Sequence, residues 1–148
     1  MTDDARGADS RQTGQDAADG PDASGEVTLF ESLGGAKGVQ ELVHEMYSRV
    51  LADEELAPFF ENAPMERIRR MQIEFVSAMT DGPVRYSGGE LRQVHQGRGI
   101  KRHHFSKFCG HMADALEARG VDARTVDGVL GRLAMYNDDV TGSVNVDG

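Results

Sequence analysis

The spacing of apolar residues constrains the fold of this chain more than any other feature of its sequence. From Val27 onward, apolar side chains recur at intervals of three and four residues, and strict alternation over the length of a strand is hard to find. An α-helix brings residues three and four apart onto one face, whereas a strand turns alternate residues to opposite faces. The pattern therefore predicts an all-α domain.

Glycine and proline between the apolar stripes indicate where the helices begin and end. Glycine commonly follows the last residue of a helix, and proline is tolerated in a first turn. Pro58 begins a short interruption that contains two adjacent aromatic residues, and Pro64 opens the next stripe. The expected helices carry their apolar residues over 29–33, 39–51, 68–79, 91–94, 105–116 and, as one last continuous helix, 126–140.

Length and charge exclude several classes of protein. The 148 residues fit one domain, and the 16 basic and 25 acidic side chains give a formal net charge of −9, which disfavours nucleic acid as a partner. No apolar run approaches the ~20 residues that cross a bilayer, and no secretory signal is found, so the expected location is the cytoplasm. The single cysteine, Cys109, provides neither an internal disulfide nor a multi-thiolate metal site.

Residues 1–25 differ in composition from the rest of the chain. They contain no Val, Ile, Leu, Phe or Tyr, and they carry six Asp against two Arg. Such a segment cannot bury enough apolar area to offset the entropy of ordering it. We therefore expect residues 1–25 to form a disordered acidic tail and residues 26–148 to form the folded domain.

Three polar side chains interrupt the apolar stripes. Tyr47, Gln72 and His95 each follow an apolar residue of their stripe by four positions, which puts them on the buried face of their helices. A buried polar group without a hydrogen-bond partner costs about 1 to 3 kcal/mol. In one interpretation, each of the three is a core residue that is satisfied separately. In the other, all three face one cavity whose ligand needs an axial base on one side and hydrogen-bond donors on the other, as haem does.

Large apolar side chains are available to enclose a flat cofactor in such a cavity. They are Phe59, Phe60, Ile68, Leu91, Ile100 and Phe105. Arg98 is a candidate partner for the carboxylates of haem, and it is equally compatible with an ordinary surface position. These residues therefore belong to the candidate site together with the three polar ones.

Four segments form a more specific pattern: Leu33-Gly34-Gly35, Tyr47-Ser48-Arg49-Val50-Leu51 with Asp53, Phe59-Phe60, and Val94-His95-Gln96-Gly97-Arg98-Gly99-Ile100. With these segments, the stretch from Leu29 to about Val140 resembles the group I truncated haemoglobins. These are short globins built as a two-over-two sandwich of helices around a haem. The resemblance covers nearly all of the expected folded domain.

The resemblance implies a role for individual residues. It implies haem b as the cofactor, His95 as the proximal ligand of the iron, and Tyr47 and Gln72 as the polar residues of the opposite, distal side. Phe60 matches the aromatic residue that wedges the haem, and Ile68 occupies the distal position where older globins have a histidine. The remaining candidates, Phe59, Leu91, Arg98, Ile100 and Phe105, surround these positions.

The resemblance also implies a function. The family binds oxygen reversibly at a five-coordinate iron, binds nitric oxide and carbon monoxide as well, and converts nitric oxide to nitrate by dioxygenation. A separate reductase would supply the electrons for that reaction. Two alternatives stay open: a non-enzymatic oxygen carrier, store or sensor, and a cofactor-free helical module that binds another protein.

Three residues depart from the pattern of the family. Asp81 stands where glycine is common, and Val76 stands where a phenylalanine often lines a ligand tunnel. Phe108 occupies a position where the residue is often smaller, so we expect it to narrow the distal site. The shape of the cavity is therefore expected to differ locally from that of the family.

Overall fold

The computed structural model describes residues 27–86 and 95–142, and within these ranges the chain is helical. The elements are α1 (Leu29–Ser32), α2 (Gly35–Leu51), the 3-10 helix η1 (Ala57–Phe60), α3 (Met65–Met79), α5 (Arg102–Ala118), α6 (Ala123–Ala134) and α7 (Asn137–Thr141). No strand occurs among these residues, which confirms the predicted all-α class. Across the same ranges, no helix has both the length and the apolar character needed to cross a bilayer. The predicted acidic tail and Leu91 lie outside the described residues.

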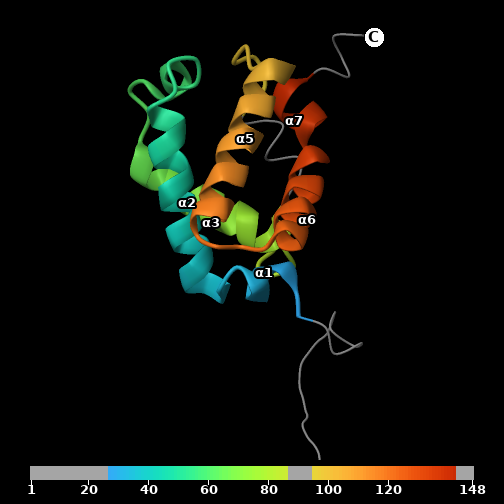
Figure 1. Cartoon of the computed structure of the whole chain (residues 1–148). Helices are drawn as coiled ribbons and strands as arrows, with labels where there is room; N and C mark the ends of the chain where they lie inside the picture. Colours follow the sequence, from blue (N-terminus) through green and yellow to red (C-terminus); the bar gives the residue numbers. More distant parts are fainter. Residues whose placement is uncertain (1–26, 87–94, 143–148) are drawn as a thin grey trace, which may run out of the picture.

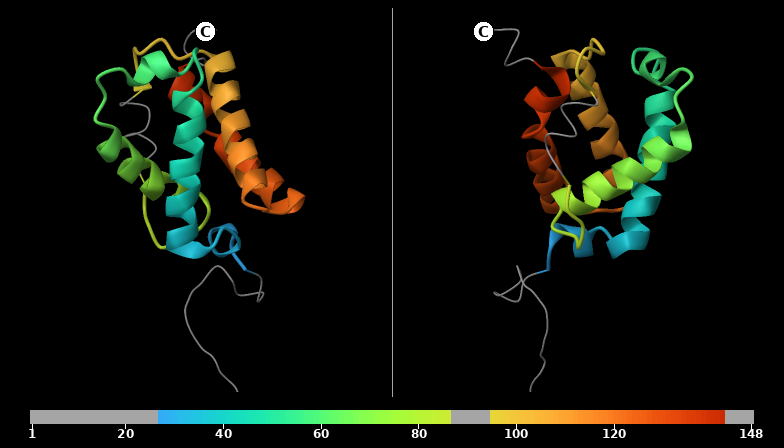
Figure 2. Two further views of the ribbon diagram at one scale, coloured as in Figure 1. Left: turned by 60° about the vertical axis from the view of Figure 1, so that its left-hand side comes forward. Right: turned by 180° about the vertical axis from the view of Figure 1, so that it is seen from behind.

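Two pairs of helices form the fold. α2 packs against α3, α5 packs against α6, and α2 also packs against α5, so the two pairs contact each other. Figure 1 shows α2 on one side of α5, with α6 and α7 on the other side. The right-hand view of Figure 2 shows α3 crossing α2. This is the predicted two-over-two arrangement.

The apolar stripe of α2 lies at the centre of the core. Val39, Leu42, Val43, Met46 and Val50 are fully buried at the three- and four-residue spacing that predicted this helix. The buried residues that α5 and α6 add to the same core include Met112, Leu116, Val129 and Leu133. Burying a large apolar side chain contributes about 1.5–3 kcal/mol, so this shared core stabilises the packing of both helix pairs.

A close backbone contact joins α1 to α2. The backbone N–H of Glu31 donates to the Thr28 hydroxyl at 3.1 Å, and the N–H of Thr28 donates to the Glu31 carboxylate at 3.3 Å, which forms a capping box at the start of α1. The chain then turns at Gly34, whose φ of 99° favours glycine. Gly38 approaches Leu33 so closely that a Cβ at position 38 would lie 1.8 Å from the Leu33 carbonyl oxygen.

The chain leaves α3 through a residue in the left-handed conformation. Asp81 has a φ of 73°, which glycine adopts without strain and a short Asp side chain tolerates. Arg132 of α6 donates to the carbonyl of Met79 at 2.7 Å and to the Asp81 carboxylate at 3.0 Å. Aspartate at this position therefore links the end of α3 to α6, which a glycine could not do.

The prediction of one continuous helix over 126–140 was wrong. α6 ends at Ala134, and α7 begins at Asn137. Between them, the N–H groups of Met135 and Tyr136 donate to carbonyls three residues back, those of Arg132 and Leu133. A tighter turn of this kind keeps apolar residues three and four apart, so the spacing from Leu133 to Tyr136 did not reveal the break.

Candidate functional site

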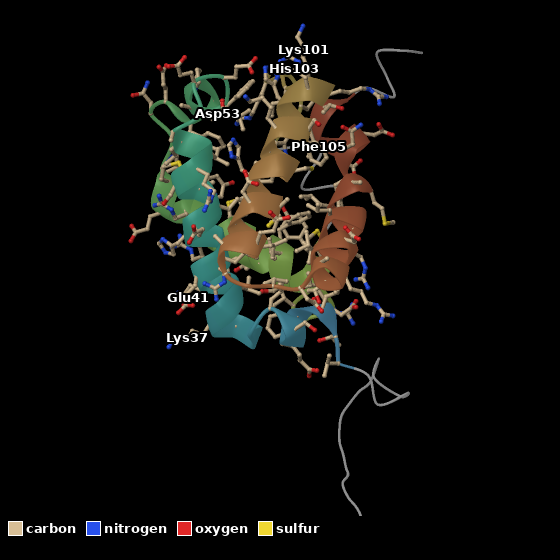
Figure 3. The ribbon with its side chains drawn as sticks, viewed as in Figure 1. Lys37, Glu41, Asp53, Lys101, His103 and Phe105 are labelled. Carbon is tan, nitrogen blue, oxygen red and sulfur yellow. The ribbon has the colours of Figure 1, made fainter. Side chains whose placement is uncertain are left out.

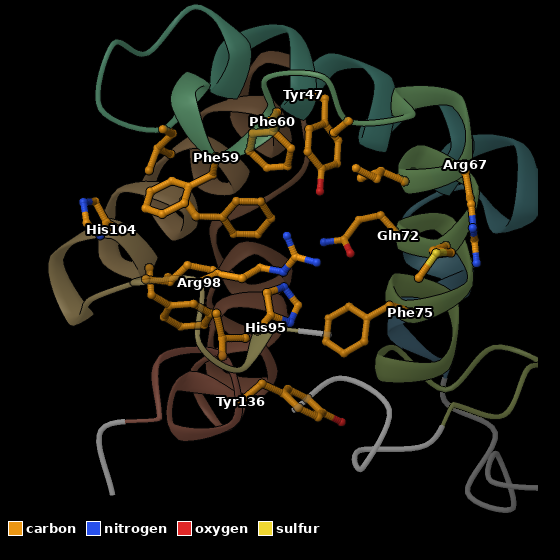
Figure 4. Close-up of a pocket in the computed structure, with 18 of the residues that line it drawn as sticks. Tyr47, Phe59, Phe60, Arg67, Gln72, Phe75, His95, Arg98, His104 and Tyr136 are labelled. Carbon is orange, nitrogen blue, oxygen red and sulfur yellow. The ribbon is translucent and has the colours of Figure 1, made fainter. Parts of the chain in front are cut away.

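A cavity of about 570 Å³ lies between the two helix pairs. This volume is within the range of about 300–1,000 Å³ that is usual for pockets that bind small molecules and cofactors. The apolar part of its wall is formed by Leu56, Phe59, Phe60, Ile68, Met71, Phe75, Ile100, Phe105, Phe108, Leu133 and Val140. Figure 4 shows 18 of the residues that line the cavity, among them Phe59, Phe60 and Phe75, around one space. The wall thus combines apolar side chains with polar ones, which are Tyr47, Glu61, Asn62, Arg67, Gln72, Tyr86, His95, Arg98, His104 and Tyr136.

Tyr47 of α2 lies on one side of this cavity with its hydroxyl pointing inward (Figure 4). The residue is only 4% exposed, because it follows Val43 by one turn on the buried face of α2. Burial raises the pKa of the Tyr47 phenol well above its usual value, and the positive charge of Arg69 opposes this shift only in part. The phenol therefore stays protonated and remains a hydrogen-bond donor.

Gln72 of α3 lies on the same side of the cavity. It is half-buried between Ile68 and Phe75 on the inner face of α3, and its amide points into the cavity near the Tyr47 hydroxyl (Figure 4). Across the described ranges, neither the Tyr47 hydroxyl nor the Gln72 amide has a hydrogen-bond partner. Two donors therefore face the cavity unpaired.

His95 lies on the opposite side of the cavity. It is half-buried, and its ring points into the space below Tyr47 and Gln72 (Figure 4). Arg98 follows one turn later at an exposed position, and its long side chain extends into the cavity, where Figure 4 draws its guanidinium between Gln72 and His95. The cavity therefore has an imidazole on one side and two neutral donors on the other.

The structure brings together the sequence-predicted site residues that it describes. Those that line the cavity are Tyr47, Phe59, Phe60, Ile68, Gln72, His95, Arg98, Ile100 and Phe105. Leu91 lies outside the described residues. Two of the residues that depart from the pattern of the truncated haemoglobins lie in different places. Phe108 also lines the cavity, whereas Val76 is fully buried in the core.

An aromatic group on the lower wall includes Phe75 and Tyr136, which sequence reasoning did not assign to the site (Figure 4). Phe75 contacts Tyr86 and Tyr136 edge to face, with ring centroids 5.1 Å and 4.9 Å apart, and all three line the cavity. The position of Phe75 was a usable signal, because it follows Gln72 by three residues on the same stripe. Tyr136 could not be placed in this way, because its orientation depends on the unexpected turn between α6 and α7.

A second polar cluster joins the end of α2 to α5. The Asp53 side chain is 8% exposed, and it lies 2.7 Å from Nε2 of His111 and 3.1 Å from Nζ of Lys107. The hydrogen bond to His111, followed by those from the Glu55 backbone and from Lys107, lowers the pKa of the Asp53 carboxyl below its usual range. Figure 3 shows Asp53 near the same end of the molecule as the start of α5. The cluster therefore fixes the turn that leads from α2 to η1.

Three residues beside this cluster have the donor types of a metal site. Ligand atoms of Glu55, His103 and His104 all lie within 4.8 Å of one another. However, the backbone N–H of Lys101 donates to Nδ1 of His104 at 2.9 Å, and Nζ of Lys107 lies 3.2 Å from the Glu55 carboxylate. A metal ion would have to displace the first contact and approach an ammonium group, so we assign no metal to this group.

Comparisons with known proteins are consistent with this geometry. A family model described as bacterial-like globin matches residues 28–142. The group 1 truncated hemoglobin GlbN of Mycolicibacterium paratuberculosis is 45% identical over 108 residues, which cover 73% of this chain and 79% of that protein. A crystal structure of a Synechococcus 2/2 hemoglobin with covalently attached heme has a TM-score of 0.74 and 29% identity over 78% of this chain and 99% of that chain. The truncated hemoglobin of Tetrahymena pyriformis in the Fe(III) form has a TM-score of 0.73 and 27% identity over 77% and 97% of the two chains.

Proposed function

The chain belongs to the bacterial-like globins, and among them to the group 1 truncated haemoglobins, and from this premise we propose how its cavity works. Its cofactor is haem b, and the family binds diatomic gases such as oxygen. We propose that the cavity holds the haem, that His95 is the proximal ligand of the iron, and that Tyr47 and Gln72 act on a gas at the opposite face.

The residues present fit this cofactor. Aromatic and aliphatic side chains of the wall suit a flat apolar ring, and the His95 imidazole matches the single protein ligand of an open globin iron. The other histidine of the wall, His104, accepts a hydrogen bond at Nδ1 from the backbone N–H of Lys101. The Arg98 side chain extends between Gln72 and His95, where the ring would lie (Figure 4). Because Arg98 is exposed and its side chain has several rotatable bonds, it can turn to the rim, where a guanidinium suits a propionate.

One observation supports a gas-binding function most directly. The buried Tyr47 hydroxyl, which has no hydrogen-bond partner among the described residues, faces the cavity across from His95. When bound, haem supplies an iron that takes up a gas molecule and donates electron density to it. Tyr47 donates its O–H, and Gln72 its N–H, toward that partial negative charge. A hydrogen bond to a charged group contributes about 1.5–3 kcal/mol, and about 1.4 kcal/mol corresponds to a tenfold change in an equilibrium constant.

We propose nitric oxide dioxygenation as the reaction of this site. Nitric oxide and oxygen combine with one electron to give one nitrate ion, so atoms and charge balance when a separate reductase supplies the electron. In this reaction, Tyr47 and Gln72 retain the oxygen until nitric oxide reaches it, while the apolar walls around them exclude water. A protein that only carried, stored or sensed oxygen would use the same donors but would not consume nitric oxide rapidly.

Rapid mixing tests the reaction. The oxygenated protein is mixed with nitric oxide in a stopped-flow instrument, and nitrate is measured at the end. We expect one nitrate ion to form for each haem. We also expect the haem to become ferric rapidly enough to be followed in the stopped-flow instrument. Slow conversion, or recovery of nitric oxide without nitrate, would show that the protein is an oxygen carrier or sensor.

A separate test concerns His95. His95→Ala is expected to lose the visible absorption band of bound haem or to need added imidazole to recover it, because His95 is the imidazole that lies across the cavity from Tyr47 and Gln72. The matched control is His44→Ala, since His44 is exposed on α2 and does not line the cavity. An unchanged haem spectrum in His95→Ala would remove His95 from the site.

A further inference from the structure

We propose that Phe108 is a positioning residue for Tyr47, which sets the direction in which the phenol donates its hydrogen bond. The inference rests on the proposed function, because it matters only if Tyr47 donates to a bound gas. It adds a residue from α5 to a site whose distal donors come from α2 and α3.

Two aromatic rings hold the ring of Tyr47 from different elements. Phe60, the last residue of η1, lies 5.6 Å away between ring centroids with planes at 85°. Phe108 of α5 lies 6.2 Å away with planes at 64°. Both contacts are edge to face, which is a favoured geometry for aromatic pairs at these distances. The Tyr47 ring is therefore confined on two sides.

Packing is the main constraint on the Tyr47 hydroxyl. Among the residues that the structure describes, no hydrogen bond holds this hydroxyl. Its position therefore depends on the torsion angles of the side chain, which the neighbouring rings restrict. A hydroxyl fixed in this way is oriented before the gas arrives and keeps its donor free, so little entropy is lost on binding.

Phe108 is itself anchored by the core face of α5. Phe105, one turn earlier, is buried, and Met112, one turn later, is fully buried. α5 packs directly against α2, which carries Tyr47. Phe60, in contrast, lies at the end of a four-residue 3-10 helix. Phe108 is thus the ring contact of Tyr47 that comes from a long, well-packed helix.

A second effect of Phe108 must be separated from this one. Phe108 also lines the cavity, so a smaller residue enlarges the cavity and can change gas binding without moving Tyr47. A double-mutant cycle separates the two effects, because an effect that acts through the phenol disappears when the phenol hydroxyl is removed, whereas an effect of cavity size persists.

The experiment compares Phe108→Leu in the natural chain and in a Tyr47→Phe background, using the haem-loaded protein. We expect Phe108→Leu to speed oxygen dissociation about threefold or more in the natural chain and to have little effect in the Tyr47→Phe background. The C–O stretching frequency of the carbon monoxide complex provides a second measurement, and Phe108→Leu is expected to shift or broaden it toward the value of Tyr47→Phe.

A third measurement does not depend on gas binding. The chain contains three tyrosines, so labelling with 3-fluorotyrosine gives three fluorine NMR signals, of which the Tyr47 signal is the one lost in Tyr47→Phe. Phe108→Leu is expected to broaden or split that signal. Phe30→Leu is the matched control, because Phe30 packs beside Gly82, away from the cavity, and is expected to leave the Tyr47 signal and the oxygen dissociation rate unchanged.

The possible failures are distinguishable. If Tyr47→Phe alone leaves oxygen dissociation unchanged, the proposed role of Tyr47 is wrong. If Tyr47→Phe speeds dissociation but Phe108→Leu does not, or if Phe108→Leu has the same effect in both backgrounds, the positioning role of Phe108 is overturned and the proposed function stands.

Discussion

Tyr47 shows how much the position of a single residue in the sequence can reveal. Its spacing from the apolar residues of its helix placed it on the buried face, and the structure finds it 4% exposed with its hydroxyl in the cavity. The path of Arg98 across the cavity could not be predicted in the same way, because a long side chain with several torsions is positioned by contacts that sequence spacing does not report.

Removing the Tyr47 hydroxyl is the simplest test at this scale. Tyr47→Phe is expected to speed oxygen dissociation at least severalfold and up to about a hundredfold, because one hydrogen bond to a charged group contributes about 1.5–3 kcal/mol. Laser photolysis or rapid mixing with carbon monoxide measures the rate. A rate equal to that of the natural chain would contradict the donor role.

The same residue makes a prediction about pH. Because burial raises the pKa of the Tyr47 phenol above its usual value near 10, the group stays protonated through alkaline pH. The oxygen dissociation rate is therefore expected to show no titration between about pH 7 and pH 10. A step in the rate near pH 10 in the natural chain that is absent from Tyr47→Phe would show that the phenol ionises normally.

At the scale of the elements, apolar spacing predicted the long helices and Pro64 indicated the start of α3, but the break between α6 and α7 was not predicted. α2, α3 and α5 lie where their apolar stripes are, whereas the turn after α6 was hidden because a tighter turn preserves the spacing. The contact of Asp53 with His111 was hidden for a different reason, since the two residues are 58 positions apart and no local pattern connects them.

The Asp53 cluster predicts a pH-dependent stability. The folded chain lowers the pKa of Asp53, so the ionised carboxylate stabilises the fold above the unfolded value near 3.9, and this contribution is lost as the pH falls below that value. Asp53→Asn is expected to unfold at a lower urea concentration than the natural chain at pH 7. The difference between the two urea midpoints is expected to shrink as the pH is lowered toward 3. A difference that stays constant over this range would rule out the carboxylate as its source.

The contact between α1 and α2 predicts opposite effects for two glycine substitutions. Gly38→Ala is expected to destabilise the fold by about 3 kcal/mol or more, because its Cβ would lie 1.8 Å from a backbone oxygen that cannot move without shifting α1. Gly110→Ala on α5 is the control, since nothing lies within 4 Å of its Cβ and alanine favours helix by up to about 1 kcal/mol. Urea unfolding of both variants measures the difference, and equal midpoints would contradict the close approach.

At the scale of the whole molecule, the two-over-two packing creates a cavity that each helix pair lines in part. Apolar spacing predicted the all-α class of the fold. The two-over-two arrangement of the helices was predicted from motifs that resemble those of the group I truncated haemoglobins. The volume and outline of the cavity required the structure, because they depend on where Phe75, Tyr86 and Tyr136 meet.

Haem is expected to stabilise the whole domain. A ligand that binds only the folded chain adds about 2.7 kcal/mol at a hundredfold excess over its dissociation constant. The haem-loaded chain should therefore unfold at a higher temperature than the haem-free chain, and His95→Ala should reduce this increment. Circular dichroism measures the unfolding temperature of each chain with and without haem. An equal rise in unfolding temperature in the natural chain and in His95→Ala would show that His95 contributes nothing to holding the cofactor.

The cavity wall includes Tyr136 and Val140, which lie beyond the last long helix, together with Tyr47 and Phe60 from the first half of the chain. A ribosome delivers the chain from its N-terminus, so the earlier helices emerge while this wall is still missing. If the iron porphyrin occupies this cavity as we propose, its insertion into a complete pocket has to wait until translation has passed position 140, so that capture of the pigment is a late event in the maturation of this protein.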